Sequence, residues 1–257
     1  PKWAGWCEVH IHGFSAPYSI AVHRGSDRLS EHVCTKGYFD IRSLEEWRSI
    51  YGDDMVSPPS TDAERKVVLD VGAHIGFISI LWAMIGHRVI AIEANPLSSA
   101  LLKSSMCRNQ LRDRIQVHTV ALARFEPLEP TSCVLQTDPT EPLKRPDGEP
   151  YFFYCRLQLC CPPLCKQMVE IVREIKVTTL SKLLATHHTS LGSIDLMKLD
   201  IEGHECEVLR DADTLWLNHA PKRIITEVWG AWKYKDSRIH HPLHNCTKGF
   251  YLRLLQQ

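Results

Sequence analysis

The sequence has no long hydrophobic run and no excess of charge of either sign. Its longest apolar stretch, from Phe77 to Ile85, is too short to cross a bilayer, which takes about 20 apolar residues. Lys and Arg total 30, and Asp and Glu also total 30, so no strong global field favours nucleic acid. No basic stripe interleaved with aromatic residues is present either. We therefore expect no membrane span in this chain and no nucleic-acid partner.

The sequence also lacks the paired C-x-x-C spacing of a structural zinc site. Of its 10 cysteines, most stand alone, and one group follows the pattern C-x4-C-C-x3-C between Cys155 and Cys165. This spacing indicates a metal only weakly, so we expect no resident metal ion. Free thiols are the expected state of the cysteines, because disulfides need an oxidising compartment that the sequence does not establish.

What the sequence does contain is the composition of an ordinary globular protein. Its 257 residues are 44% hydrophobic and 23% charged, which is enough for one substantial core. We expect an N-terminal cap and linker over residues 1–62 and one main domain over residues 63–257. Residues 125–176 hold 8 of the 15 prolines, so they are predicted to form an insertion rather than a central strand.

The sequence gives only a default expectation about location. No signal peptide is visible, and the chain begins at Pro1 rather than Met. A cytoplasmic location is therefore the default, and an endomembrane location is the alternative if an anchor segment precedes Pro1. The glycosylation sequon at Asn245 matters only under that alternative.

One stretch, V-V-L-D-V-G-A-H-I-G over residues 67–76, organises the chain. Its β-branched apolar run ends in a tight glycine turn, which predicts a buried parallel strand followed by a helix through Ile85. Glycines at such a turn let a ligand approach the backbone at the carboxyl end of the strand. Gly72 and Gly76 are therefore candidate cofactor-binding residues.

A second stretch, V-I-A-I-E-A-N-P over residues 89–96, repeats this pattern. An apolar strand ends at Glu93, and Asn95 is the expected N-cap of a helix that has Pro96 at its first position. An acid at the end of such a strand binds the ribose hydroxyls of a nucleotide cofactor. Together the two stretches predict a cofactor that carries a nucleoside.

The spacing of the first turn favours one class of cofactor. A dinucleotide site needs G-x-G-x-x-G, but here the turn is D-x-G-x-x-x-G, with Ala73 and His74 where the middle glycine is wanted. S-adenosylmethionine (SAM) has no pyrophosphate, has a ribose for Glu93, and presents an amino-acid end to the polar groups between Asp70 and His74. We therefore predict a SAM site. The alternatives are an NAD-dependent oxidoreductase and a catalytically inactive SAM- or nucleotide-binding module.

The rest of the pattern predicts an α/β fold with a doubly wound, mostly parallel, Rossmann-like sheet. A helix over residues 96–110 and a strand over residues 115–123 follow the second stretch. Later strands are expected at residues 174–179, 194–200 and 223–229. Crossovers between parallel strands are right-handed, which places helices on both faces of the sheet.

A polar cluster follows the strand at residues 194–200. Asp200, Glu202 and His204 lie in a glycine turn, and Glu227 lies near the end of a later strand. Methyl transfer to a hydroxyl needs positioning and a base; Asp200 and His204 are the candidates, with Glu202 or Glu227 orienting one of them. The alternative is that these carboxylates bind Mg²⁺ or Ca²⁺, although no spacing rule demands a metal.

With these motifs in place, the chain resembles the FkbM-type methyltransferases, which are class I SAM-dependent enzymes. The resemblance rests on residues 69–76, 89–96 and 194–205, and on Asn109-Gln110-Leu111 leading into residues 120–122. It implies a seven-stranded class I fold and methyl transfer to an oxygen, for which we expect a small-molecule or glycan hydroxyl.

The resemblance also implies roles for individual residues. Glu93 would hold the ribose, Ala94 and Asn95 would flank the adenosine, and Asp200 would lie by the transferred methyl. The residues that would surround the methionine end of SAM are Asp70, Gly72, Ala73, His74 and Gly76. Acceptor identity is expected to depend on the insertion and the N-terminal cap, where side-chain geometry decides specificity.

Overall fold

A computed structural model describes residues 4–14, 17–24, 27–123, 134–137, 154–156, 170–171, 176–187, 191–201, 205–210 and 212–226. The chain divides into two compact units. The first comprises Pro1–Thr119 and Ile194–Lys198, and the second comprises Val120–Ser193 and Leu199–Gln257.

The central sheet is built on parallel strands, as the sequence predicts. Strand β3 (Val67–Val71) pairs in parallel with β4 (Arg88–Ile92), and β4 pairs in parallel with β5 (Ile115–His118). The strand order of the whole sheet is β12-β11-β3-β4-β5, in which β11 is Leu196–Leu199 and β12 is Ile224–Thr226. The order therefore reverses direction at β3, where an α/β sheet opens a ligand crevice. This confirms the predicted Rossmann-like sheet, with five strands among the described residues rather than the seven that the resemblance implies.

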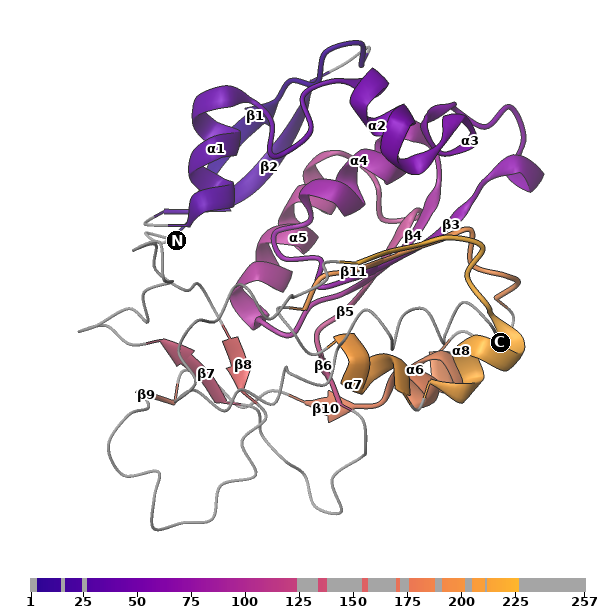
Figure 1. Ribbon diagram of the computed structural model, residues 1–257. Helices are drawn as coiled ribbons and strands as arrows, with labels where there is room; N and C mark the ends of the chain where they lie inside the picture. Colours follow the sequence, from indigo (N-terminus) through magenta and orange to yellow (C-terminus); the bar gives the residue numbers. More distant parts are fainter. Residues whose placement is uncertain are drawn as a thin grey trace, which may run out of the picture. The chain divides into compact units, whose positions relative to one another are not determined.

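Two helices cross over between the strands of the first unit (Figure 1). They are α4 (Phe77–Ile85), after β3, and α5 (Pro96–Arg108), after β4. Asn95 caps α5, because its side-chain oxygen accepts from the Leu97 N–H at 2.9 Å, and Pro96 follows it at the first helical position. The predicted capping of this helix is thus confirmed.

Aromatic side chains anchor the segment before β3 on α4. Its helices are α2 (Leu44–Tyr51), α3 (Asp53–Val56) and the short 3₁₀ helix η1 (Asp62–Glu64). Trp47 and Trp82 are fully buried, and their rings meet edge to face at 5.5 Å. Tyr51 adds a second edge-to-face contact with Trp82 at 5.0 Å. Such pairs add to the free energy gained from area burial alone.

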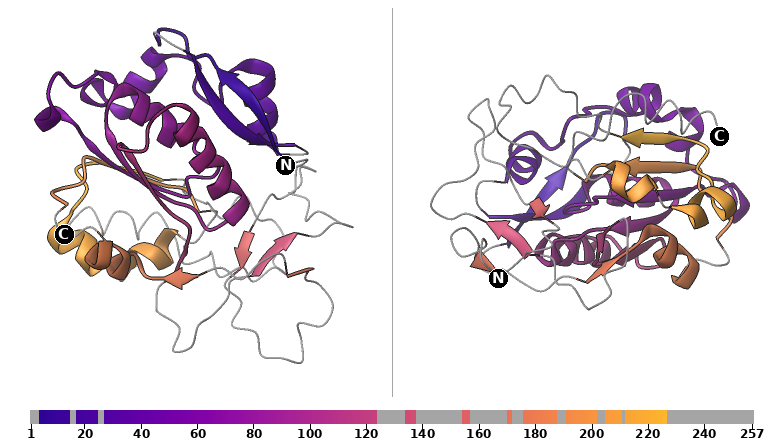
Figure 2. Two further views of the ribbon diagram at one scale, coloured as in Figure 1. Left: turned by 180° about the vertical axis from the view of Figure 1, so that it is seen from behind. Right: turned by 60° about the horizontal axis from the view of Figure 1, so that its bottom comes forward.

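Helix α5 is buried on two sides, which explains its serine-rich sequence. On one side it packs toward the sheet through Leu101 and Leu102. On the other it meets strand β2 (Tyr18–His23), as the reverse view in Figure 2 shows. Ser105 Oγ accepts from the Ala21 N–H at 2.8 Å, and the Asn109 side chain donates to the Ser19 carbonyl at 2.6 Å. A polar face of α5 is therefore paired with a strand rather than with solvent.

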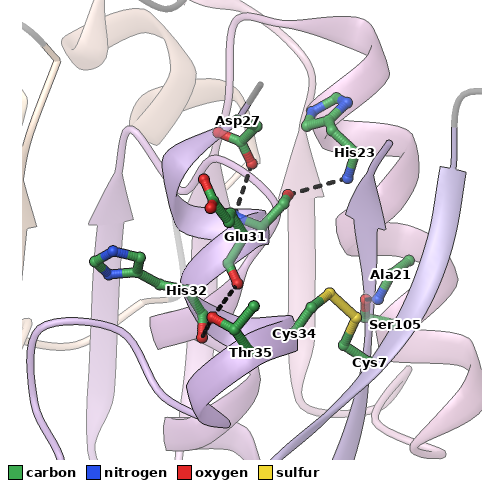
Figure 3. Close-up of a disulfide and its surroundings, with 10 residues drawn as sticks. Cys7, Ala21, His23, Asp27, Glu31, His32, Cys34, Thr35 and Ser105 are labelled. Atoms are coloured by element: carbon green, nitrogen blue, oxygen red, sulfur yellow. Dashed lines mark hydrogen bonds between the residues drawn. A yellow bond between two sulfur atoms is a disulfide. The ribbon is translucent and has the colours of Figure 1, made fainter. Parts of the chain in front are cut away.

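The N-terminal region is a hairpin and a helix joined by a covalent bond. Strand β1 (Ala4–Val9) pairs antiparallel with β2, and α1 (Arg28–Lys36) follows. A disulfide joins Cys7 on β1 to Cys34 on α1 across 27 residues of sequence (Figure 3). Cys206 is disulfide-bonded too, whereas Cys107 is a free, exposed thiol. The expectation of free thiols is therefore wrong for Cys7, Cys34 and Cys206.

One further expectation needs correction. The strand expected over residues 115–123 divides, because β5 ends at His118 and β6 (Ala121–Leu122) pairs instead with β10 (Val177–Thr178) in a separate parallel sheet. After Asp200 the described residues contain two helices, α7 (Glu205–Arg210) and α8 (Asp213–Asn218).

The second unit contains the remaining described elements. Strands β7 (Val134–Thr137), β8 (Tyr154–Arg156) and β9 (Glu170–Ile171) form an antiparallel sheet in the order β8-β7-β9. This sheet lies within the predicted insertion. Helix α6 (Leu180–His187) is capped by Thr179, whose hydroxyl accepts from the Lys182 N–H at 3.1 Å. No helix in the described part of the chain is long and apolar enough to cross a membrane.

Candidate cofactor site

The turn after β3, residues 72–76, is here called the cofactor loop. Its Gly72, His74 and Gly76 all have positive φ, at 82°, 51° and 87°. Gly76 is required for space as well, since a Cβ there would lie 2.1 Å from Leu102 Cδ1. The Gly72 and Ala73 N–H groups both donate to the Ile92 carbonyl, at 2.9 and 3.1 Å. The loop is thereby held over the end of β4.

Glu93 follows β4 and faces this loop. One carboxylate oxygen accepts from the His74 N–H at 2.7 Å and the other from the Asn95 N–H at 2.7 Å. The side chain is only 8% exposed, and this burial raises the pKa of Glu93, while His74, the two hydrogen bonds and Lys198 oppose the rise. Because a carboxylate has about four acceptor sites, Glu93 keeps capacity for two hydroxyl donors after both backbone bonds are made.

Two buried polar atoms beside Glu93 have no hydrogen-bond partner among the described residues. They are His74 Nδ1 and Asn95 Nδ2. Buried polar atoms in native proteins are nearly always paired, so each such atom requires an explanation. A bound nucleoside with hydroxyl, amino and carboxylate groups supplies suitable partners. The residues present therefore fit SAM.

Asp70 lies on β3, two residues before the loop, and is fully buried. It accepts from the Ser79 hydroxyl at 2.5 Å. Its other oxygen lies 3.6 Å from Lys198 Nζ. Lys198 also donates to the Gly72 carbonyl at 3.2 Å. Asp70 is thus tied to the loop through Lys198, and its predicted contact with the cofactor stays a prediction.

The His74 ring meets residues from the N-terminal region. Its Nε2 lies 3.7 Å from an Asp27 carboxylate oxygen, and its centroid is 5.9 Å from that of His23. His23 Nε2 is hydrogen-bonded to Ser98 Oγ at 3.0 Å. Burial lowers the pKa of His23, the charge of His74 lowers it further, and Asp27 opposes both.

The cofactor-binding candidates all lie in the first unit, whereas the one described catalytic candidate, Asp200, belongs to the second. Asp70, Gly72, Ala73, His74, Gly76, Glu93, Ala94 and Asn95 all belong to the first unit. Asp200 follows β11, is half-buried, and belongs to the second unit. The other three candidates, Glu202, His204 and Glu227, lie outside the described residues.

Sequence reasoning missed Lys198, Asp27 and His23. A signal existed for Lys198, since a lysine inside an apolar parallel strand requires a partner. Asp27 stands at an N-cap position before α1, which explains it without reference to the loop. Within the described part of the chain, no group of three or more His, Cys, Asp or Glu side chains is placed to hold a metal ion.

The class I methyltransferase fold has three features that are present here. The strand order of its parallel sheet reverses at β3, a glycine loop follows β3, and an acidic residue with a hydrogen-bonded carboxylate follows β4. The family model described as the methyltransferase FkbM domain matches residues 70–246. The chain belongs to the FkbM methyltransferase family, whose cofactor is SAM.

Solved structures with a related fold include three methyltransferases. The METTL16 methyltransferase domain is 15% identical, with 84% of this chain and 60% of that one covered and a TM-score of 0.45. The Geobacter metallireducens precorrin-6Y C5,15-methyltransferase is 11% identical, with 76% and 67% covered and a TM-score of 0.36. The T. thermophilus 16S rRNA N2 G1207 methyltransferase RsmC, solved with AdoMet and guanosine, is 21% identical, with 47% and 28% covered and a TM-score of 0.32.

These likenesses do not identify an acceptor. The chain covers less than two thirds of the length of METTL16's domain and of RsmC, and a search of curated proteins finds no match. The expectation that nucleic acid is not a partner stays a prediction.

Proposed function

We propose that this chain is a SAM-dependent O-methyltransferase whose acceptor is a hydroxyl group of a small molecule or glycan. The observation that carries the proposal is the fixed orientation of the Glu93 carboxylate, which accepts hydrogen bonds from two backbone N–H groups at 2.7 Å each. A carboxylate fixed in this way directly after β4 is suited to accept hydrogen bonds from two adjacent ribose hydroxyls. His74 Nδ1 and Asn95 Nδ2, which have no hydrogen-bond partner among the described residues, are available for further polar contacts with the nucleoside.

The residues of the chain have few chemical tasks in this reaction. SAM, when bound, supplies a methyl group that its positive sulfur already activates. Glu93, His74 and Asn95 would hold the nucleoside, and the cofactor loop would hold the amino-acid end. The acceptor oxygen gains the methyl and loses its proton, so a base must stand beside it. Asp200 is the proposed base, with His204 as the alternative and Glu202 or Glu227 orienting it.

The cofactor half of the proposal is tested by calorimetric titration of the chain with SAM and, separately, with NAD. We expect SAM to bind and NAD not to bind. Glu93→Ala should weaken SAM binding by about 1–3 kcal/mol, the usual cost of an unmade buried polar contact. The matched control is Glu45→Ala, because Glu45 is an exposed glutamate on α2. NAD binding, or SAM binding indifferent to Glu93→Ala, would overturn the assignment.

The acceptor half needs a transfer assay. Radiolabelled methyl from SAM should appear in a hydroxyl compound or glycan from a panel that also contains RNA. Asp200→Asn should reduce transfer by about 100-fold or more, the usual contribution of a general base, while leaving SAM affinity unchanged. Transfer to RNA instead would overturn the proposed acceptor class, and binding without any transfer would favour the inactive binding module.

A further inference from the structure

We propose that Lys198 is a positioning residue for the cofactor loop. Its ammonium group fixes the Gly72 carbonyl and so determines the backbone conformation of the loop that would face SAM. This inference rests on the proposed SAM site and gives a role to a residue that has none in the sequence analysis or in the proposed mechanism. It is argued from one buried lysine that contacts both Asp70 on β3 and Gly72 in the cofactor loop.

Lys198 is an unusual residue for its strand. The other residues of β11, Leu196, Met197 and Leu199, are 0% exposed, and the Lys198 side chain is itself only 13% exposed. Burying an ammonium group is costly unless it is paired and hydrogen-bonded. A hydrophobic residue would fill this position at lower cost, so the lysine requires partners that justify it.

Its first partner fixes where the ammonium group lies. Asp70 Oδ1, on β3, is 3.6 Å from Lys198 Nζ. The other oxygen of Asp70 accepts from the Ser79 hydroxyl on α4, so the carboxylate is held from its far side. Lys198 therefore has a fixed counter-charge on β3.

Its second partner is the loop itself. Lys198 Nζ donates to the Gly72 carbonyl at 3.2 Å, and the Gly72 N–H donates to the Ile92 carbonyl at 2.9 Å. The peptide group before Gly72 is thus held by β4, and the peptide group after it is held by Lys198 through the Gly72 carbonyl and by β4 through the Ala73 N–H, which donates to the Ile92 carbonyl at 3.1 Å. Gly72 has a φ of 82° and no side chain to restrict it, so these bonds together fix how the loop leaves β3, and Lys198 supplies the bond to the Gly72 carbonyl.

Lys198 also affects the pKa of Glu93, the residue predicted to bind the ribose. Burial raises the pKa of Glu93, and the charges of His74 and Lys198 both lower it. The His74 ring in turn faces Asp27 and His23. Removing the Lys198 charge should therefore let the pKa of Glu93 rise further, and a protonated Glu93 is a poorer acceptor for ribose hydroxyls.

The first experiment needs no cofactor. Hydrogen exchange of the Gly72, Ala73 and His74 amides should be at least 10-fold faster in Lys198→Met than in the wild type, because the loop loses the bond to its Gly72 carbonyl. Lys198→Arg, which keeps the charge and the donors, should restore most of the protection. Lys198→Gln serves if the Met variant does not fold, and Lys36→Met, at an exposed lysine of α1, is the control. Unchanged exchange in a folded Lys198→Met protein would overturn the proposal.

The second experiment measures SAM affinity against pH. Affinity should fall at least 10-fold in Lys198→Met at pH 7. As the pH is lowered, the variant should also begin to lose SAM affinity at a higher pH than the wild type does, because the pKa of Glu93 rises without the Lys198 charge. A lysine that only fills space would leave this pH midpoint unmoved. Absence of SAM binding to the wild type would overturn the proposed function, whereas normal SAM binding with an unmoved midpoint in Lys198→Met would overturn the role of Lys198 alone.

Discussion

The Asp27 carboxylate lies 3.7 Å from the Nε2 atom of His74 and so joins the start of α1 to the cofactor loop. Asp27 is 6% exposed, and its other oxygen accepts from the Ser30 N–H at 2.9 Å as the N-cap of α1. One side chain therefore serves a helix end and a loop that is 47 positions further along the chain. The N-terminal segment contributes directly to the surroundings of the predicted SAM site.

The two tasks of Asp27 are separable by substitution. Asp27→Asn keeps an N-cap acceptor and should leave the free energy of unfolding within about 0.5 kcal/mol, whereas Asp27→Ala should cost about 1 kcal/mol. Urea unfolding followed by circular dichroism measures both. Equal losses in the two variants would show that the charge beside His74, rather than the cap, stabilises this region.

Gly76 should not tolerate a side chain. Gly76→Ala places a Cβ 2.1 Å from Leu102 Cδ1 at a φ of 87°, and the overlap and the backbone strain should together cost about 2–4 kcal/mol. Gly192→Ala is the matched control, because its Cβ would meet nothing within 4 Å. Adding Leu102→Ala to Gly76→Ala should relieve the overlap but not the backbone strain. Denaturant unfolding of all three proteins distinguishes the two causes, and a stable Gly76→Ala single variant would contradict the observed packing.

Stability should fall in mildly acidic solution because of His87. This ring is 1% exposed; its Nδ1 accepts from the Lys66 N–H at 3.3 Å, and its Nε2 bonds the Met55 carbonyl at 2.9 Å. Burial is the main cause that lowers the pKa of His87 from 6.5.

The unfolded chain therefore takes up a proton at His87 before the folded chain does. The contribution of His87 is full above pH 6.5 and is lost as the pH falls below that value toward the lowered pKa. His23 acts in the same direction. Urea unfolding at pH 7.5 and at pH 5.5 should show the loss, and His87→Gln should reduce the difference between the two. An unchanged pH dependence in His87→Gln would exclude His87 as the cause.

The Cys7–Cys34 bond should stabilise the N-terminal hairpin and helix. It closes a loop across a sequence separation of 27, for which chain-entropy arguments give about 3.5 kcal/mol. The double variant Cys7→Ser/Cys34→Ser should have a free energy of unfolding lower by about that amount. A reductant breaks this bond in the wild type and should destabilise it, whereas the double variant has no such bond to lose. Cys107→Ser is the control, because Cys107 is a free exposed thiol. An unaffected double variant would show that the hairpin and helix hold without the bond.

The parts that could be predicted from the sequence are those whose signal is local. The strand-turn-helix pattern at residues 67–76 and the capped helix after Glu93 are both carried by consecutive residues, and both form as expected. The family resemblance rests on the same stretches, and the family match begins at Asp70.

The parts that could not be predicted depend on residues far apart in the chain. Cys7 meets Cys34 only because a hairpin and a helix bring them to a Cα separation of 5.1 Å, and nothing in their spacing indicates it. Ser105 of α5 is buried and accepts from the Ala21 N–H of β2, and the local sequence of α5 does not indicate this contact. Lys198 is 126 positions from Gly72, so its role emerges only after the strands are assembled.

The disulfide between β1 and α1 also bears on how the protein is produced. Such a bond forms where thiols are oxidised and is rare in a reducing cytosol. Protein expressed in a reducing bacterial host would lack the covalent link beside the helix that begins at Asp27, and Asp27 contacts the cofactor loop. Material purified from a periplasmic or secretory host, with its thiols counted, is therefore the sample on which cofactor affinity should be measured.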